Sequence, residues 1–264
     1  MKNISCLLLL IPVLFGSCEK VIDLKYTDNE VKFVIEGTLT NEPGSCTVLL
    51  SKTRNFKDSS PFSGLSGGMV KIENNGTTYT LPETSPGVYK LSTLTGVPGQ
   101  TYHLTVAVEG QTFSASSTMP LPVPFDDFYL KPKDFDSLRT ITYVKYKDPA
   151  NQANFYWFEL FVNDKRQRNF SLMNDQFTPG QEVNTPVIFE NKTDDLSRNF
   201  KKGDKLALEM HSIDASVYLY LFSLSAAEGS DNGAAPANPL SNLTGGALGF
   251  FSAQTTQKRT LVIP

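Results

Sequence analysis

Three groups of neighbouring carboxylates offer the first candidate chemistry in this chain. They are Asp126-Asp127, Asp134 with Asp136, and Asp194-Asp195. Paired carboxylates can hydrolyse glycosides by acid–base catalysis, or they can bind calcium through their oxygens. No segment has the spaced Asp/Asn and Gly loop with a distal Glu that characterises a calcium loop. Because each pair lies beside Pro, Lys or Arg, we expect solvated turns, with calcium binding and hydrolysis as the alternatives.

The two histidines, His103 and His211, lie on polar faces of expected strands far apart in the chain. A zinc site normally needs several His or Cys at characteristic spacing, so we expect no metal site and two exposed histidines. A Ser-His-Asp triad stays open because its members are distant in sequence, but no Gly-x-Ser-x-Gly elbow favours it. The glycines of Gly245–Gly249 lack the context of a phosphate-binding loop and favour a bulge or close packing. We expect no catalytic residues and no cofactor.

The cysteines suggest a modification rather than catalysis. Cys46 lies in a strand-like run, where a small buried hydrophobe is the simplest interpretation. A reactive thiol would need a neighbouring base and a lowered pKa, and no nearby residue supplies them.

Cys18 closes a segment that has the order of a secretory signal. Lys2 gives a positive start, Cys6 to Phe15 is an apolar run of ten residues, and Gly16-Ser17-Cys18 follows. The run is too short to span a bilayer, which needs about 20 apolar residues. Phe15-Gly16-Ser17-Cys18 resembles a bacterial lipobox, in which the cysteine is acylated and cleavage falls just before it. We therefore expect a signal peptide at 1–17, lipid attachment at Cys18 and a tether at 18–25. The alternative is an ordinary signal peptide with an incidental cysteine.

Charge and length narrow the class of protein. The chain has 264 residues and a formal net charge of −3, without a basic stripe. This balance disfavours nucleic acid as a partner. No second apolar stretch is long enough to span a membrane, so lipid would be the only anchor. The length beyond the leader suits two domains.

The first half of the mature chain reads as short strands separated by turns. Asn74-Asn75-Gly76 between alternating runs predicts a hairpin. In Tyr102–Val108, alternate side chains are apolar, as in a strand with one buried face. About seven such strands favour an immunoglobulin-like β-sandwich over 26–119.

The prolines of 120–124 predict a stiff linker, and the strand pattern begins again after it. Phe155–Val162 is an aromatic strand that we expect to be buried on both faces. Asp214 is positioned to cap a helix near 214–228, and a closing strand is expected at Arg259–Ile263. We expect a second, β-rich domain over 125–264, sandwich or barrel-like, with one helix.

Several segments resemble one family in order and over nearly the whole mature chain. They are Cys18–Leu24, Val34–Gly37, Thr40–Gly44, Ser85–Tyr89, Gly99–Tyr102, Asn238–Asn242 and Gly245–Phe251. The chain resembles the Bacteroidota outer-membrane lipoproteins catalogued as domain of unknown function 4249. The resemblance implies an outer-membrane lipoprotein, often encoded beside a TonB-dependent receptor, and it supplies no catalytic residues.

We therefore expect a non-enzymatic lipoprotein of the outer membrane, on its periplasmic or surface side, that binds a ligand or partner. Its membrane contact would be the lipid on Cys18, and its partner a TonB-dependent uptake receptor. Exposed aromatic side chains and the loop at 229–239 are the expected contact surface for a small molecule or glycan. The alternatives are an envelope hydrolase that uses a carboxylate pair on glycans, and a structural or adhesive surface protein.

Overall fold

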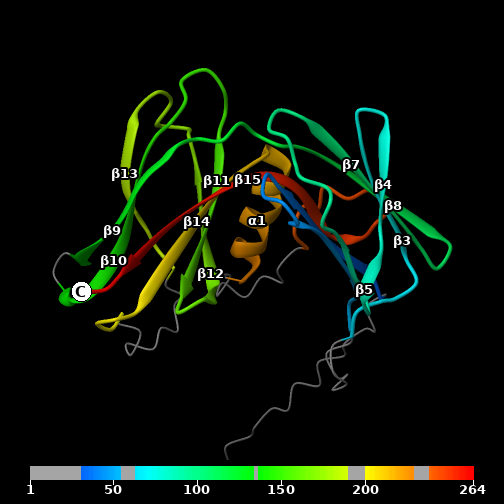
Figure 1. The fold of residues 1–264 in the computed structure, drawn as a ribbon, viewed down its shortest axis with the longest axis horizontal. Coiled ribbons are helices and arrows are strands. Elements are labelled where there is room, and N and C mark those ends of the chain that lie inside the picture. The colour runs from blue at the N-terminus through cyan, green and yellow to red at the C-terminus, as the bar shows by residue number, and fades with distance from the viewer. Residues whose placement is uncertain (1–30, 55–62, 134–135, 190–199, 229–237) are drawn as a thin grey trace, which may run out of the picture. The chain divides into compact units, whose positions relative to one another are not determined.

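The computed structural model describes residues 31–54, 63–133, 136–189, 200–228 and 238–264, and it describes no side chains over 133–139 (Figure 1). Within these residues the chain is mainly β, as the sequence predicts, with strands in several sheets. The strands up to residue 118 are β1 (Phe33–Thr40), β2 (Cys46–Lys52), β3 (Met69–Asn74), β4 (Thr77–Leu81), β5 (Glu83–Ser85), β6 (Val88–Leu91), β7 (Thr101–Val108) and β8 (Gln111–Thr118). The later elements are β9 (Phe125–Lys133), β10 (Asp136–Lys147), β11 (Phe155–Val162), β12 (Lys165–Asn174), β13 (Glu182–Val187), β14 (Lys205–Ile213), the helix α1 (Ala215–Glu228) and β15 (Leu248–Val262).

A β-sandwich forms the first half of the described chain. The sheet β4-β3-β7-β8 packs on β1 and β2, and the side chains between them form a shared apolar core. In β7 the alternation is as predicted: Tyr102, Leu104, Val106 and Val108 are buried. Asn75 and Gly76 both have positive φ, at 49° and 75°, as the expected hairpin between β3 and β4 requires.

A second apolar core lies between β9-β10-β13 and the strands β11 and β14. Its largest members include Tyr146 on β10 and Tyr156 and Phe158 on β11. Trp157 points to the other face of β11, where it packs with α1 and β15. The aromatic strand at Phe155–Val162 is therefore buried on both faces, as expected.

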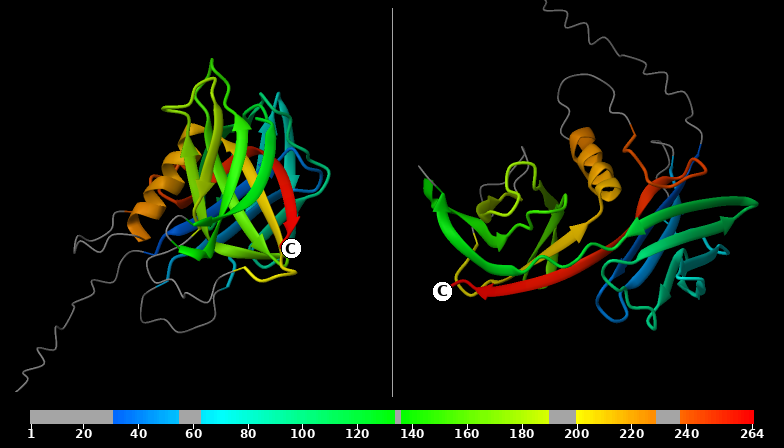
Figure 2. Two further views of the ribbon diagram at one scale, coloured as in Figure 1. Left: turned by 90° about the vertical axis from the view of Figure 1, so that its left-hand side faces the viewer. Right: turned by 90° about the horizontal axis from the view of Figure 1, so that it is seen from above.

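One strand, β15, connects the two cores. Leu248–Gln254 pairs in parallel with β1, and Thr255–Val262 pairs antiparallel with β14. The result is one sheet in the order β12-β11-β14-β15-β1-β2-β6-β5, and Figure 2 shows β15 as a continuous curved strand within it. The expected closing strand at Arg259–Ile263 is only the last part of this element.

Because of this pairing, the segments 26–119 and 125–264, expected to be two domains, are joined by a continuous sheet. β15 comes from the second of these segments, yet half of it completes the sheet of the first. The expected linker at 120–124 is also not a free spacer, because Val123 is buried and its carbonyl accepts a hydrogen bond from Gln257 of β15. The two expected domains share one sheet. Periodicity does not reveal this, because it identifies a strand but not its partner.

Gly249 allows β15 to approach β1. Its φ is +100°, and a Cβ added there would lie 2.0 Å from the Ile35 carbonyl oxygen. Only glycine fits this position, so the close packing predicted for the glycines of Gly245–Gly249 is confirmed at this residue.

The helix α1 is confirmed where it is expected, and Asp214 is its N-cap. The Asp214 carboxylate accepts a hydrogen bond of 3.0 Å from the Val217 amide. Val217 and Leu221 are buried against Trp157 and Phe250 of the long sheet, so α1 covers the sheet face opposite the two cores.

Candidate functional site

On the sheet face that carries Trp157, the four neighbouring strands β12, β11, β14 and β15 bring five ionisable side chains together. Glu159 of β11 lies directly opposite Glu209 of β14, and His211 follows two residues later on the same face. Across the other edge of β14, Lys258 of β15 lies opposite Glu209. Arg166 reaches the group from β12, the neighbour of β11. We call Glu159, Arg166, Glu209, His211 and Lys258 the paired cluster.

Each carboxylate of the paired cluster has a cationic partner. Arg166 forms an ion pair with Glu159 Oε1, and Lys258 Nζ lies 2.9 Å from Glu209 Oε1. His211 Nε2 lies 3.2 Å from Glu159 Oε2 and 3.9 Å from Glu209 Oε2. Two negative charges on facing strands would repel each other, and the two cations offset that repulsion.

A row of buried polar side chains on β15 orients the His211 ring. Ser252 Oγ donates to Gln254 Oε1 at 2.7 Å, and Gln254 Nε2 lies 3.0 Å from His211 Nδ1. Thr256 Oγ1 lies 2.9 Å from the same nitrogen. With Gln254 donating to Nδ1, the ring proton sits on Nε2 and is donated to Glu159.

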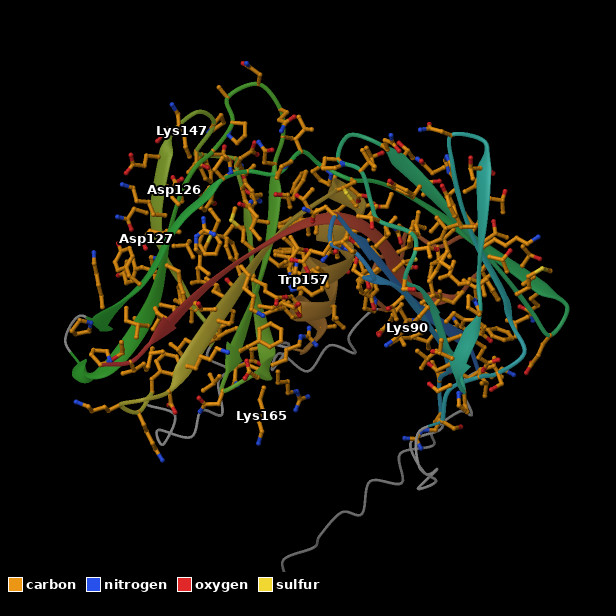
Figure 3. The ribbon with its side chains drawn as sticks, in the orientation of Figure 1. Lys90, Asp126, Asp127, Lys147, Trp157 and Lys165 are labelled. Atoms are coloured by element: carbon orange, nitrogen blue, oxygen red, sulfur yellow. The ribbon has the colours of Figure 1, made fainter. Side chains whose placement is uncertain are left out.

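The expectation that His211 is exposed is wrong. Its exposed fraction is 3%, because the side chains of Trp157, Gln254 and Thr256 surround its ring. Its ring is 4.9 Å from that of Trp157, which Figure 3 labels. His103 is exposed as expected, and its Nδ1 lies 2.7 Å from Ser116 Oγ. The sequence predicted a solvent-exposed polar face for β14. The structure shows a second apolar cluster on this side of the sheet, where α1, the helix that follows β14, packs on Trp157.

The surroundings of Glu159 favour its charged form. Burial raises the pKa of this carboxyl, but the hydrogen bond from His211 and the charge of Arg166 outweigh it. The net result is a pKa below the usual value for glutamate. Glu159 is thus a stabilised anion, unlike a general acid, which needs a raised pKa.

Glu159, Glu209 and His211 have ligand atoms within 4.8 Å of one another, a spacing that a metal ion could bridge. Arg166 and Lys258 already neutralise the two carboxylates, however. A divalent ion would have to displace both cations or add two uncompensated charges to a buried region. The chemistry of the paired cluster therefore fits an internal network that links β11, β12, β14 and β15.

An open hollow of about 550 Å³ lies elsewhere on the structure, among β1, β2 and β6. Its lining includes Val34, Glu36, Leu49, Lys52, Pro86 and Val88. Lys52 is held by an ion pair with Glu109, and its ammonium lies 4.8 Å from the centre of the Phe33 ring. A mostly apolar lining with a few fixed polar groups is the usual character of a ligand site, and the volume is in the usual range.

The carboxylates singled out from the sequence do not form a site in the described residues. Asp126 and Asp127 are exposed on β9, away from Trp157, as Figure 3 shows. One Asp127 oxygen accepts a hydrogen bond from the adjacent Phe128 amide. The two carboxylates are solvated as expected, but they lie on a strand paired with β10 and not in the expected turn. Asp134, Asp194 and Asp195, the side chain of Asp136, and Cys18 with the rest of 1–30 lie outside the described residues.

Cys46 is buried, as expected. Its exposed fraction is 0%, and burial raises the pKa of the thiol to about 12. The thiol is therefore protonated at neutral pH and is not a nucleophile.

None of the helices in the described parts of the chain has the length and apolar character needed to cross a membrane.

Comparisons with known proteins identify a family and several structural likenesses. The family model described as "Domain of unknown function (DUF4249)" matches residues 19–260. No curated protein matches the chain. Among solved structures, a two fibronectin type-III domain segment from chicken tenascin is 10% identical, with a TM-score of 0.21, over 67% of this chain and 90% of that one. A structure titled "putative carbohydrate binding protein" from Bacteroides uniformis ATCC 8492 is 11% identical, with a TM-score of 0.22, over 70% of this chain and 90% of that one.

Proposed function

This chain belongs to the DUF4249 family, and on that premise we propose that it is a lipid-anchored protein of the bacterial outer membrane. In this proposal it binds a ligand or partner without catalysing a reaction, as an accessory to a TonB-dependent uptake receptor. The lipid on Cys18 holds it at the membrane. The hollow among β1, β2 and β6 receives the ligand or a segment of the partner.

The hollow is the observation that carries the binding part of the proposal. Its apolar lining can bury nonpolar surface, and Glu36 and Lys52 can orient a polar group. No histidine or cysteine is among the described residues that line it. The combination of an apolar lining with two charged side chains supports recognition of a ligand that has both nonpolar and polar parts.

The paired cluster supports binding over hydrolysis for a different reason. A glycosidase needs one protonated carboxyl and one ionised carboxylate that face the substrate. In the paired cluster the carboxylates are ion-paired with Arg166 and Lys258, and Glu159 has a lowered pKa. Such an arrangement stabilises a fold more readily than it donates a proton.

The anchor rests on the sequence around Cys18. The family match begins at residue 19, so the whole apolar leader lies outside it. A single acyl chain binds membranes only marginally, whereas two or more chains give a stable anchor. A lipidated Cys18 that carries several chains would hold the protein at the membrane without a spanning segment.

Cell fractionation tests the anchor with a matched pair of cysteine variants. Cys18→Ala should move the protein from the membrane fraction to the soluble fraction, because it removes the acylated thiol. Cys46→Ala removes a buried thiol that cannot be acylated in the folded protein, and it should stay with the membrane. Equal membrane retention of both variants would refute the lipid anchor.

Co-purification tests the partner. The tagged protein, extracted from outer membranes in mild detergent, should recover a TonB-dependent receptor. Leu49→Arg places a charge in the hollow and should weaken this recovery at least tenfold. Leu121→Arg is the control, because Leu121 is exposed but does not line the hollow. Recovery of the wild-type protein alone would contradict the proposal.

A further inference from the structure

Two buried carboxylates lie where the strands β10 and β12 end. Asp148 follows β10 directly, and Asp175 follows β12 directly. The Asn154 amide donates to Asp175 Oδ2 at 2.9 Å, and the Asp148 amide donates to the Gln181 carbonyl at 2.9 Å. The loop 148–154 and the turn 175–181 are thereby joined.

Neither carboxylate has a cationic partner among the described residues. The exposed fractions are 0% for Asp148 and 8% for Asp175. None of the ion pairs formed by the described residues includes either of them. We call Asp148 and Asp175 the unpaired carboxylates. An isolated buried carboxylate is costly, so it is normally neutralised by a proton, a charged side chain or a metal ion.

The hydrogen bonds that join the loop 148–154 to the turn 175–181 bring the unpaired carboxylates within range of each other's charge. Burial raises the pKa of Asp148, the hydrogen bond from Tyr156 opposes this change, and the charge of Asp175 adds to it. Both carboxylates also raise the pKa values of Tyr146 and Tyr156, for which burial is the largest cause. Both carboxylates therefore act on the same two buried tyrosines.

Two oxygens in this region have no hydrogen-bond partner among the residues that the structure describes. Asp148 Oδ1 accepts a hydrogen bond from the Tyr156 hydroxyl, but Asp148 Oδ2 is buried and has no partner. Thr178 Oγ1 is likewise buried without a partner, and the Thr178 amide donates to the Asp175 carbonyl at 3.0 Å. Buried polar atoms are almost always satisfied, so an unsatisfied carboxylate oxygen of Asp148 and an unsatisfied hydroxyl oxygen of Thr178 require an explanation.

We propose that Asp148 and Asp175, with Thr178 Oγ1 as a neutral oxygen, bind a calcium ion between the loop 148–154 and the turn 175–181. Calcium takes six to eight oxygen ligands in flexible geometry, and carboxylates, carbonyls and water all serve. Among the described residues, those that hydrogen-bond to these carboxylates are Asn154 and Tyr156, neither of which is a histidine or a cysteine. Zinc prefers histidine nitrogen and cysteine sulfur as ligands, so it is a poorer match than calcium. The calcium ion would neutralise the carboxylates and hold together the ends of β10, β11 and β12.

Calorimetry on the purified full-length protein tests the site. After treatment with EDTA and its removal, titration with CaCl2 should show one ion bound per chain, and the melting temperature should rise with calcium. Asp148→Asn should weaken calcium binding at least tenfold and abolish the rise. Asp126→Asn is the control, because it removes an exposed carboxylate from β9, and it should bind calcium as the wild type does.

Three outcomes would overturn the proposal. One is a folded wild-type protein that releases or absorbs no heat on titration with calcium and whose melting temperature does not change. This result would mean that Asp148 is neutralised by a proton. Another is undiminished binding by Asp148→Asn. A third is equal affinity for MgCl2, which would refute selection of calcium. If Asp148→Asn does not fold, Asp175→Asn gives the same test with the hydrogen bond from Tyr156 to Asp148 intact.

Discussion

The paired cluster and the unpaired carboxylates each contain two acidic side chains, of which Glu159, Asp148 and Asp175 are buried and Glu209 is partly buried, but they balance the charge differently. Arg166 and Lys258 neutralise Glu159 and Glu209 within the protein. Asp148 and Asp175 have no such partner among the described residues. A cluster that is neutral without a ligand stabilises the sheet. A cluster that is charged without a ligand is better suited to bind one.

The largest effect is expected when the paired cluster loses one partner. Arg166→Met leaves the buried Glu159 carboxylate with His211 alone. Breaking a buried pair costs ~3–5 kcal/mol, and since Arg166 is 53% exposed we expect about 2 kcal/mol less free energy of unfolding. Urea denaturation at pH 7 measures it. Adding Glu159→Gln should recover part of the loss, whereas strictly additive losses would show that the two residues do not interact.

At the unpaired carboxylates we expect a substitution to raise the free energy of unfolding instead of lowering it. Without calcium, Asp148→Asn removes a buried charge and retains an acceptor for the Tyr156 hydroxyl. We expect its free energy of unfolding in EDTA to rise by about 1 kcal/mol relative to the wild type. Asp126→Asn should differ by less than about 0.5 kcal/mol, as surface substitutions usually do. A fall in stability for Asp148→Asn in EDTA would remove the contrast between the two clusters.

Acid should weaken the paired cluster. The pKa of Glu159 is lowered by folding, so its stabilising contribution is present above the unfolded pKa of about 4.3 and is lost as the pH falls through the folded pKa. The difference in stability between the wild type and Glu159→Gln should therefore be constant from pH 6 to 7 and shrink below pH 4. Denaturation curves across this range measure it. A difference that grows on acidification would contradict the lowered pKa.

The smallest effect is expected at Cys46, a buried group that stays neutral and serves as the reference for the buried carboxylates. With a pKa of about 12, roughly one thiol in ten thousand is ionised at pH 8. We expect Ellman's reagent to leave Cys46 unreacted in the native protein and to react within minutes in denaturant. Fast reaction in the native protein would mean that the core around Cys46 opens readily.

Local features were predictable because neighbouring residues determine them. The hairpin at Asn75-Gly76 follows from two residues that tolerate positive φ, and α1 follows from a cap at Asp214 and its apolar positions. The burial of Cys46 follows from the strand pattern around it. In each case the sequence within one element contains the information.

Long-range pairings were not predictable in the same way. β15 pairs with β1, which lies more than 200 residues earlier in the chain, and this pairing determines that one sheet spans both cores. His211 meets Glu159 only because β14 pairs with β11, and α1 packs on Trp157, which lies beside His211 on the same face. Asp148 and Asp175 lie in separate loops that meet through backbone hydrogen bonds. Alternation reveals which residues share a face, but not what covers that face.

The proposed function depends above all on the lipid at Cys18, and intact-mass spectrometry of the protein from native membranes tests it most directly. The account predicts a chain that begins at Cys18, with the mass of residues 18–264 plus acyl chains attached at that residue. A mass that retains residues 1–17, or a Cys18 with a free thiol, would contradict it.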